Sequence, residues 1–139
     1  MSNEIKYVNK RMIVTINKLS ILLTHGISLD HNNIRDGQAF GFVDRIYSNN
    51  VFGEKIFPDI FHQAAAYLFY IIKNHLFHDG NKRTGLAVAI LFLEWNDILF
   101  TPFNEEEVFN FIMEIAAGEN VADKAIPKIA QWFKSMSIN

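Results

Sequence analysis

The stretch "AAAYLFYIIKNHLFHDGNKRTGLAVAILFL", residues 64–93, places a cluster of polar residues between two apolar runs. In the first run apolar side chains recur at three- and four-residue steps, and Asp59 precedes the run as a helix cap. Residues 86–93 are apolar throughout but far too short to cross a membrane, so we expect a helix that is buried on all sides. The pattern predicts two central helices, over about 60–75 and 81–96, joined by a polar loop.

The rest of the chain also has helical periodicity, with apolar residues three or four positions apart. Gly26 is the expected stop of the first helix, Asn104 caps a later one that Gly118 ends, and Pro127 is expected to kink or divide the last. Residues 28–38 have the composition of a loop, and residues 51–59 that of an extended flap or irregular loop. The fold predicted is all-α, a single domain over residues 1–139 with about six helices. The further helices are expected over residues 8–25, 39–47, 104–117 and 121–136.

Composition excludes several classes of function. Half of the 139 residues are hydrophobic and the formal net charge is −2, with Lys and Arg scattered along the chain, which argues against a nucleic-acid partner. Cysteine is absent, so disulfides and thiolate metal sites are excluded and a cytoplasmic location is compatible. No run reaches the roughly 18 apolar residues of a membrane span. We expect a soluble protein with protein or nucleotide partners.

The polar cluster "HLFHDGNKRTG", residues 75–85, has the chemistry of a phosphate site. The first turn of the second central helix offers backbone amides that have no intrahelical acceptor, and Gly80 lets a ligand approach them. Lys82 and Arg83 add positive charge that repels the helix dipole unless an anion compensates it. Asp79 near a phosphate requires a mediator such as Mg²⁺. His75 can accept a proton near neutral pH, as a general base does.

Each residue of the cluster taken alone also has a purely structural interpretation. A histidine at a helix end is commonly a cap, an aspartate a turn residue, and lysine or arginine a solvated side chain. Phe77 is expected to point into the core and His78 toward solvent. His25, His31 and His62 lie in separate segments, so a structural zinc site is not expected.

The cluster also resembles the signature of the Fic/Doc family, in the Doc form His-x-Phe-x-Asp-Ala/Gly-Asn-Lys-Arg-Thr. The similarity extends from about Gly26 through the last helix and includes "AAGEN". Residues 1–20 match the family only in being helical. The chain is also compatible with a domain of a longer protein. The resemblance implies an all-α fold with the motif between the two central helices. It also implies specific roles: His75 as catalytic base, Asp79 as Mg²⁺ ligand, and Gly80, Asn81, Lys82 and Arg83 as the phosphate cup, with Lys82 and Arg83 also acting in transfer. Lys73 lies where toxins of the Doc branch can carry a further basic residue that contacts phosphate.

Two departures from the Fic form favour the Doc branch. Lys82 stands where Fic adenylyltransferases have a small glycine, and Leu86 where they have a second arginine. The resemblance therefore implies transfer of the γ-phosphate of ATP to a Ser or Thr hydroxyl, with elongation factor Tu as the suspected target and a small antitoxin with a disordered tail as partner. AMP transfer and a non-catalytic binding module are the alternatives. Residues 51–59 are the candidate for target docking, with a plain loop as the equally weighted alternative; the target hydroxyl and the oligomeric state are left open.

Overall fold

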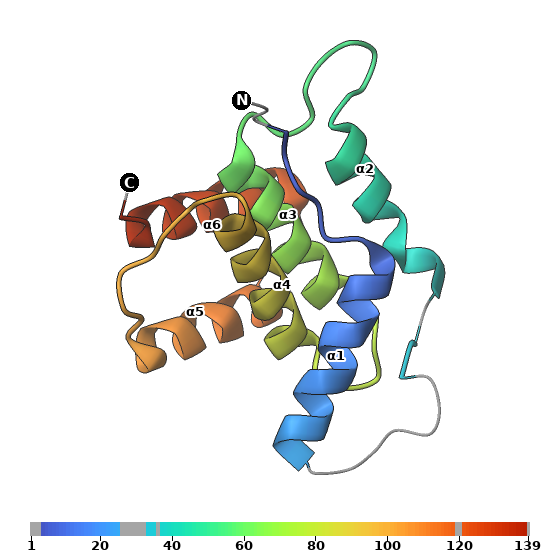
Figure 1. Ribbon diagram of the computed structural model, residues 1–139, viewed down its shortest axis with the longest axis vertical. Coiled ribbons are helices and arrows are strands. Elements are labelled where there is room, and N and C mark those ends of the chain that lie inside the picture. The colour runs from blue at the N-terminus through green and yellow to red at the C-terminus, as the bar shows by residue number, and fades with distance from the viewer. Residues whose placement is uncertain (1–3, 26–32, 36, 119–120, 139) are drawn as a thin grey trace.

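A computed structural model describes residues 4–25, 33–35, 37–118 and 121–138, and it is all-helical as predicted (Figure 1). Within these ranges, backbone pairing outside the helices is limited to isolated bridges. Predicted features at Gly26, at residues 28–32 and His31, and at the end of "AAGEN" lie outside the described residues. The elements are α1 (Lys10–His25), the 3₁₀ helix η1 (Gly37–Gly41), α2 (Phe42–Ser48), α3 (Ile60–Lys73), α4 (Asn81–Trp95), α5 (Glu105–Ala117) and α6 (Ala122–Met136).

Helix α3 forms the centre of the core and α4 packs against it. The α3 side chains are buried almost without interruption from Gln63 to Ile72. A Cβ added at Gly85 of α4 would lie 3.1 Å from Leu68 Cδ1 and 3.3 Å from the Leu68 carbonyl oxygen, so glycine permits this close approach. The prediction that residues 86–93 would be buried on all sides is wrong, because Leu91 is 36% exposed. The most deeply buried helix is instead α3, which has neighbouring helices on more sides than α4.

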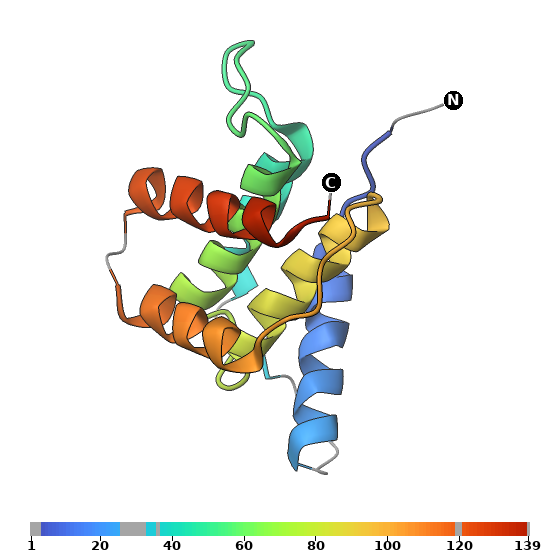
Figure 2. The same ribbon diagram turned by 90° about the vertical axis from the view of Figure 1, so that its left-hand side faces the viewer.

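The other helices surround this pair. Figure 2 shows α1 beside α4 and, on the other side, α5 and α6 running crosswise to the central pair. The first described residues are tied to the core by Tyr67, which is fully buried. Its hydroxyl donates to the Val8 carbonyl at 2.8 Å and accepts from the Val8 amide at 3.0 Å, and burial raises the pKa of this phenol far above its ordinary value.

The predicted caps are confirmed. Asp59 Oδ1 accepts from the amide of His62 at 2.9 Å, and Asn104 Oδ1 accepts from the amide of Glu107 at 3.1 Å. Gly118 is the C-cap of α5. Pro127 lies inside α6 without dividing it.

Residues 51–59 lie at the end of α3 opposite the polar cluster. Val51 and Glu54 exchange two backbone hydrogen bonds of 2.8 and 3.0 Å around Phe52 and Gly53, which both have positive φ, as in a type I′ hairpin turn. This loop leads into the start of α3, whereas His75 follows the end of α3 (Figure 1). The 14 residues of α3 separate the loop from His75 by about 21 Å. The segment that pairs with the polar cluster is residues 33–35.

Candidate active site

His75 sits at the corner where α3 ends. Helix α3 stops at Lys73, two residues earlier than predicted, and Asn74 is its C-cap. His75 then adopts φ 48°, a left-handed conformation in which histidine is several-fold enriched among non-glycine residues. Its amide donates to the Ile72 carbonyl at 3.3 Å and its side chain is exposed. The corner therefore points a histidine outward from a buried helix.

The next two residues anchor the loop in the core. Leu76 and Phe77 are 0% and 1% exposed, which confirms the prediction for Phe77. On either side, the Arg35 amide donates to the Leu76 carbonyl at 2.7 Å and the His78 amide donates to the Asn33 carbonyl at 3.0 Å. His78 itself is exposed, as predicted. The loop is thus held by two buried side chains and by a short bridge to residues 33–35.

Asn17 of α1 is a site residue that the sequence did not reveal. Its side-chain amide donates to the Asp79 carbonyl at 3.0 Å and to Thr84 Oγ1 at 3.1 Å, and its own carbonyl accepts from Asn33 Nδ2 at 2.9 Å. Asn17 and Thr84 are completely buried. Gly80, with φ 84°, passes so close that an added Cβ would lie 3.1 Å from Asn17 Nδ2. The only sign of this role in the sequence is a polar residue four positions after Ile13, on the side of the expected helix that carries the apolar residues.

The first turn of α4 is oriented by Asn81. Its side chain accepts from the Phe77 amide at 3.0 Å and donates to the Phe77 carbonyl at 2.8 Å. The first bond within the helix runs from the Thr84 amide to the Gly80 carbonyl at 2.8 Å, so the preceding amides are the ones that α4 itself leaves for an outside acceptor. The side chain of Asn81 fixes the loop, and its backbone is the part suited to an anion.

These residues surround one polar pocket of about 390 Å³. The first turn of α4 contains no acidic side chain, so Lys82 and Arg83 make this end of the pocket positive. Among the described residues there is no group of three or more His, Cys, Asp or Glu side chains that could enclose a metal ion. A single carboxylate in a pocket of this kind suits a Mg²⁺ ion whose other ligands are phosphate oxygens and water. The lining consists of Ile72, His75, His78, Asp79, Gly80, Asn81, Lys82, Arg83 and Ala116.

Lys73 is placed differently from the other predicted site residues. Its ammonium group donates to the carbonyls of Ala116 and Gly118 at 3.1 and 2.8 Å, at the C-terminal end of α5. Cations in this position satisfy the last carbonyls of a helix and complement its dipole. Lys73 therefore fixes α5 against α3, next to the polar pocket.

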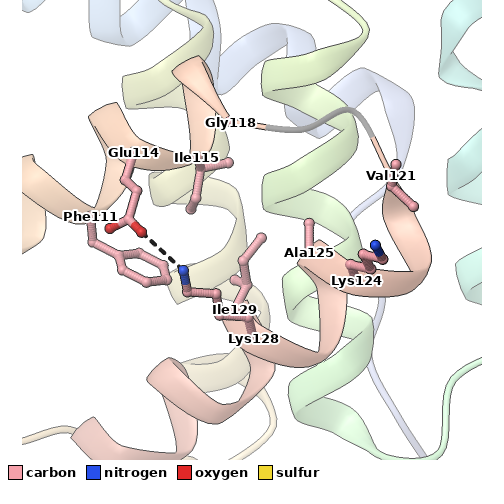
Figure 3. Close-up of a pocket in the computed structure, with 9 residues that line it drawn as sticks. All are labelled: Phe111, Glu114, Ile115, Gly118, Val121, Lys124, Ala125, Lys128 and Ile129. Atoms are coloured by element: carbon pink, nitrogen blue, oxygen red, sulfur yellow. Dashed lines mark hydrogen bonds and ion pairs between the residues drawn. The ribbon is translucent and has the colours of Figure 1, made fainter.

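An apolar cavity of about 290 Å³ between α5 and α6 contains none of the predicted site residues (Figure 3). Phe111 and Ile129 form part of its wall, and Lys128 pairs with Glu114 at 2.9 Å across the two helices.

In the described part of the chain, no helix has the length and hydropathy needed to span a membrane.

The sequence is similar to that of proteins of one known family. The model of the Fic/DOC family matches residues 7–93, which include the whole polar cluster. The chain is 32% identical over 83 residues to "Protein kinase doc" of Escherichia phage P1, covering 60% of this chain and 63% of that protein. It is also 32% identical over 81 residues to "Toxin Doc" of Mycolicibacterium smegmatis, covering 58% of this chain and 62% of that protein. The matches thus span less than two thirds of either relative.

Proposed function

This chain belongs to the Fic/DOC family, and from that premise we propose that it is a toxin of the Doc branch that transfers the γ-phosphate of ATP to a Ser or Thr hydroxyl of a protein. One observation carries the proposal: a single pocket contains His75, Asp79 and the start of α4 with Lys82 and Arg83. A proton acceptor, a carboxylate and a positive helix end are the groups that phosphoryl transfer requires together.

In the proposed reaction each group has a defined task. His75 accepts the proton of the target hydroxyl as its oxygen bonds to the γ-phosphorus and ADP leaves. The backbone amides from Gly80 onward, with Lys82 and Arg83, hold the phosphate oxygens and neutralise their charge. Asp79 would hold Mg²⁺, which would offset the negative charge that develops on the phosphate oxygens during transfer. Lys73 supports the pocket by holding α5 in place.

The residues beside the cup favour γ-phosphate transfer over AMP transfer. Lys82 fills the position where Fic adenylyltransferases leave room for backbone to approach phosphate. In Fic adenylyltransferases a second arginine orients the γ-phosphate for AMP transfer. Here that position is Leu86, an apolar side chain that lines a groove together with Lys82 and Arg83. The target we propose is elongation factor Tu, in the cytoplasm.

A small antitoxin with a disordered tail is the proposed protein partner, as the name "Toxin Doc" of one relative suggests. Helix α1 exposes Leu19, Leu22 and Leu23, which recur at three- and four-residue steps. An exposed apolar surface of this kind is typical of a site that a partner helix covers.

The direct test is transfer of radioactive label from ATP to elongation factor Tu in the presence of Mg²⁺. We expect γ-labelled ATP to label the target, α-labelled ATP to leave it unlabelled, and His75→Ala to lower transfer by roughly 10²–10⁴-fold, the usual contribution of a general base. His78→Ala, which changes the pocket's other histidine, is the matched control and should lose far less. Transfer of α-label would instead establish AMP transfer, and absence of both would contradict this target.

A further inference from the structure

The loop between α2 and α3 carries a phenylalanine that is both fully exposed and conformationally strained. Phe52 is 100% exposed, so no part of its own chain covers the ring, and the exposed Val51 lies next to it in sequence. Its φ of 52° lies in the left-handed region, where a bulky side chain is disfavoured and where a type I′ turn usually has asparagine or glycine. Figure 1 shows this loop projecting beyond the helices. Strain of this kind indicates a role outside the fold, such as contact with another molecule.

The loop holds this side chain in a fixed position. The side chain of Asn49 accepts from the Phe57 amide at 2.7 Å and donates to the Phe57 carbonyl at 3.0 Å. Inside the turn, Asn50 Oδ1 accepts from the Gly53 amide at 3.0 Å. Residues 51–54, which we call the knob, are therefore ordered before any contact forms. A preordered group loses less conformational freedom on binding than a flexible one.

The apolar cavity of about 290 Å³ between α5 and α6 has a suitable size for such a ring (Figure 3). Its wall includes Ile115, Ala125 and Ile129, and it opens to solvent, since Val121 and Lys124 on its lining are exposed. An apolar cavity of roughly 150 Å³ is already large enough to bind benzene. The α5–α6 cavity can therefore hold the ring of a phenylalanine from outside.

We propose that the knob of one copy of this chain inserts Phe52 into the α5–α6 cavity of a second copy. The charges beside the two surfaces are complementary: the exposed Glu54 lies two positions after Phe52, and the exposed Lys124 lies on the lining of the cavity. Within the described residues, neither of these two charged groups takes part in an ion pair. The formal net charge of −2 opposes self-association only weakly.

This contact joins two different surfaces of the same chain. Each open assembly therefore keeps one free knob and one free cavity, so further copies add until a ring closes or a chain of copies forms. One side chain in one cavity is a small interface, and we expect the association to be weak. The knob and the cavity contain none of the residues of the polar pocket, so the contact goes beyond the proposed phosphate transfer and does not depend on it.

Sedimentation velocity of the whole chain over a range of concentrations tests the proposal, and the mean mass should rise with concentration. Phe52→Asn removes the ring and suits the turn, whereas Ala125→Phe fills the cavity. Each change should weaken self-association by roughly 30-fold or more, the loss typical of an interface hot spot. Phe109→Asn, which removes another exposed phenylalanine from α5, is the matched control and should associate like the unmodified chain.

Mixing the two variants gives the sharper result. The Phe52→Asn chain keeps its cavity and the Ala125→Phe chain keeps its knob. Together they should form a complex of two chains and no larger one, because the remaining knob position and the remaining cavity are both blocked. A complex in the mixture also shows that each variant has kept the surface it contributes.

The other outcomes overturn the proposal. An unmodified chain that stays monomeric up to about 1 mM has no such contact. If Ala125→Phe associates normally while Phe52→Asn does not, the knobs of two copies contact each other and the cavity is not used. If Phe52→Asn associates normally, another surface joins the copies. If the mixture forms no complex, Phe52 does not enter the cavity.

Discussion

Replacing His75 with glycine is expected to stabilise the fold while it removes activity. The left-handed backbone at His75, with φ 48°, costs a non-glycine residue about 1–2 kcal/mol. Glycine removes this cost but loses about 0.5–1 kcal/mol more conformational entropy on folding. The side chain is exposed, so little packing is lost. The free energy of unfolding should rise by about 0.5–1 kcal/mol, equivalent to roughly 2–5 °C in Tm.

Urea unfolding followed by far-ultraviolet circular dichroism measures this change, and two variants serve as controls. His75→Ala keeps the Cβ and hence the strain, so its stability should stay within about 0.5 kcal/mol of the unmodified chain. Asp97 occupies the same position after α4, with φ 70°, an exposed side chain and an amide bonded to the Glu94 carbonyl at 3.1 Å. Asp97→Gly should therefore gain similar stability and retain label transfer. The reasoning is refuted if Asp97→Gly is stabilised while His75→Gly is no more stable than His75→Ala.

Three further predictions concern groups that hold the site and its central helix. Asn17→Leu should lower stability by about 1–3 kcal/mol and reduce phosphate transfer more than tenfold, since buried partners lose their donor; urea unfolding and label transfer on the same samples check both. Tyr67→Phe should cost about 1–3 kcal/mol in urea unfolding, because both backbone groups of Val8 lose their partner, with transfer unchanged. Burial raises the pKa of Asp59, but hydrogen bonds from the ring and amide of His62 outweigh it and hold that pKa below the ordinary value of 3.8. The Asp59 cap therefore contributes stability above its unfolded pKa and loses it as pH falls through the folded pKa; stability measured from neutral pH downward should fall less steeply below about pH 4 in Asp59→Asn.

Local rules predicted the helices because the signals that set them are local. Capping by Asp59 and Asn104 requires only residues three positions apart, and both caps form as expected. The side on which α4 is exposed depends instead on where α1 and α5 pack, which no local pattern records. Lys73 illustrates the same limit, since its bonds to the end of α5 join residues more than 40 positions apart. The sequence predicted a cation near the pocket, but it could not show that the carbonyls at the end of α5 would bind this cation.

The loop between α3 and α4 is positioned by its surroundings more than by its own bonding. It begins and ends in left-handed conformations, at His75 and Gly80, and the first of these is strained. Such a loop persists only if other contacts determine it, and here Leu76 and Phe77 are buried in the core while Asn17 binds the Asp79 carbonyl from α1. Asn17 lies 62 positions before Asp79 and within the residues that the family model matches, although residues 1–20 were expected to match only in being helical; a segment far from the motif in sequence therefore supplies a contact on which the motif depends. Conversely, the motif can present its exposed groups in one arrangement before any ligand binds, because helices far apart in sequence have already fixed its backbone.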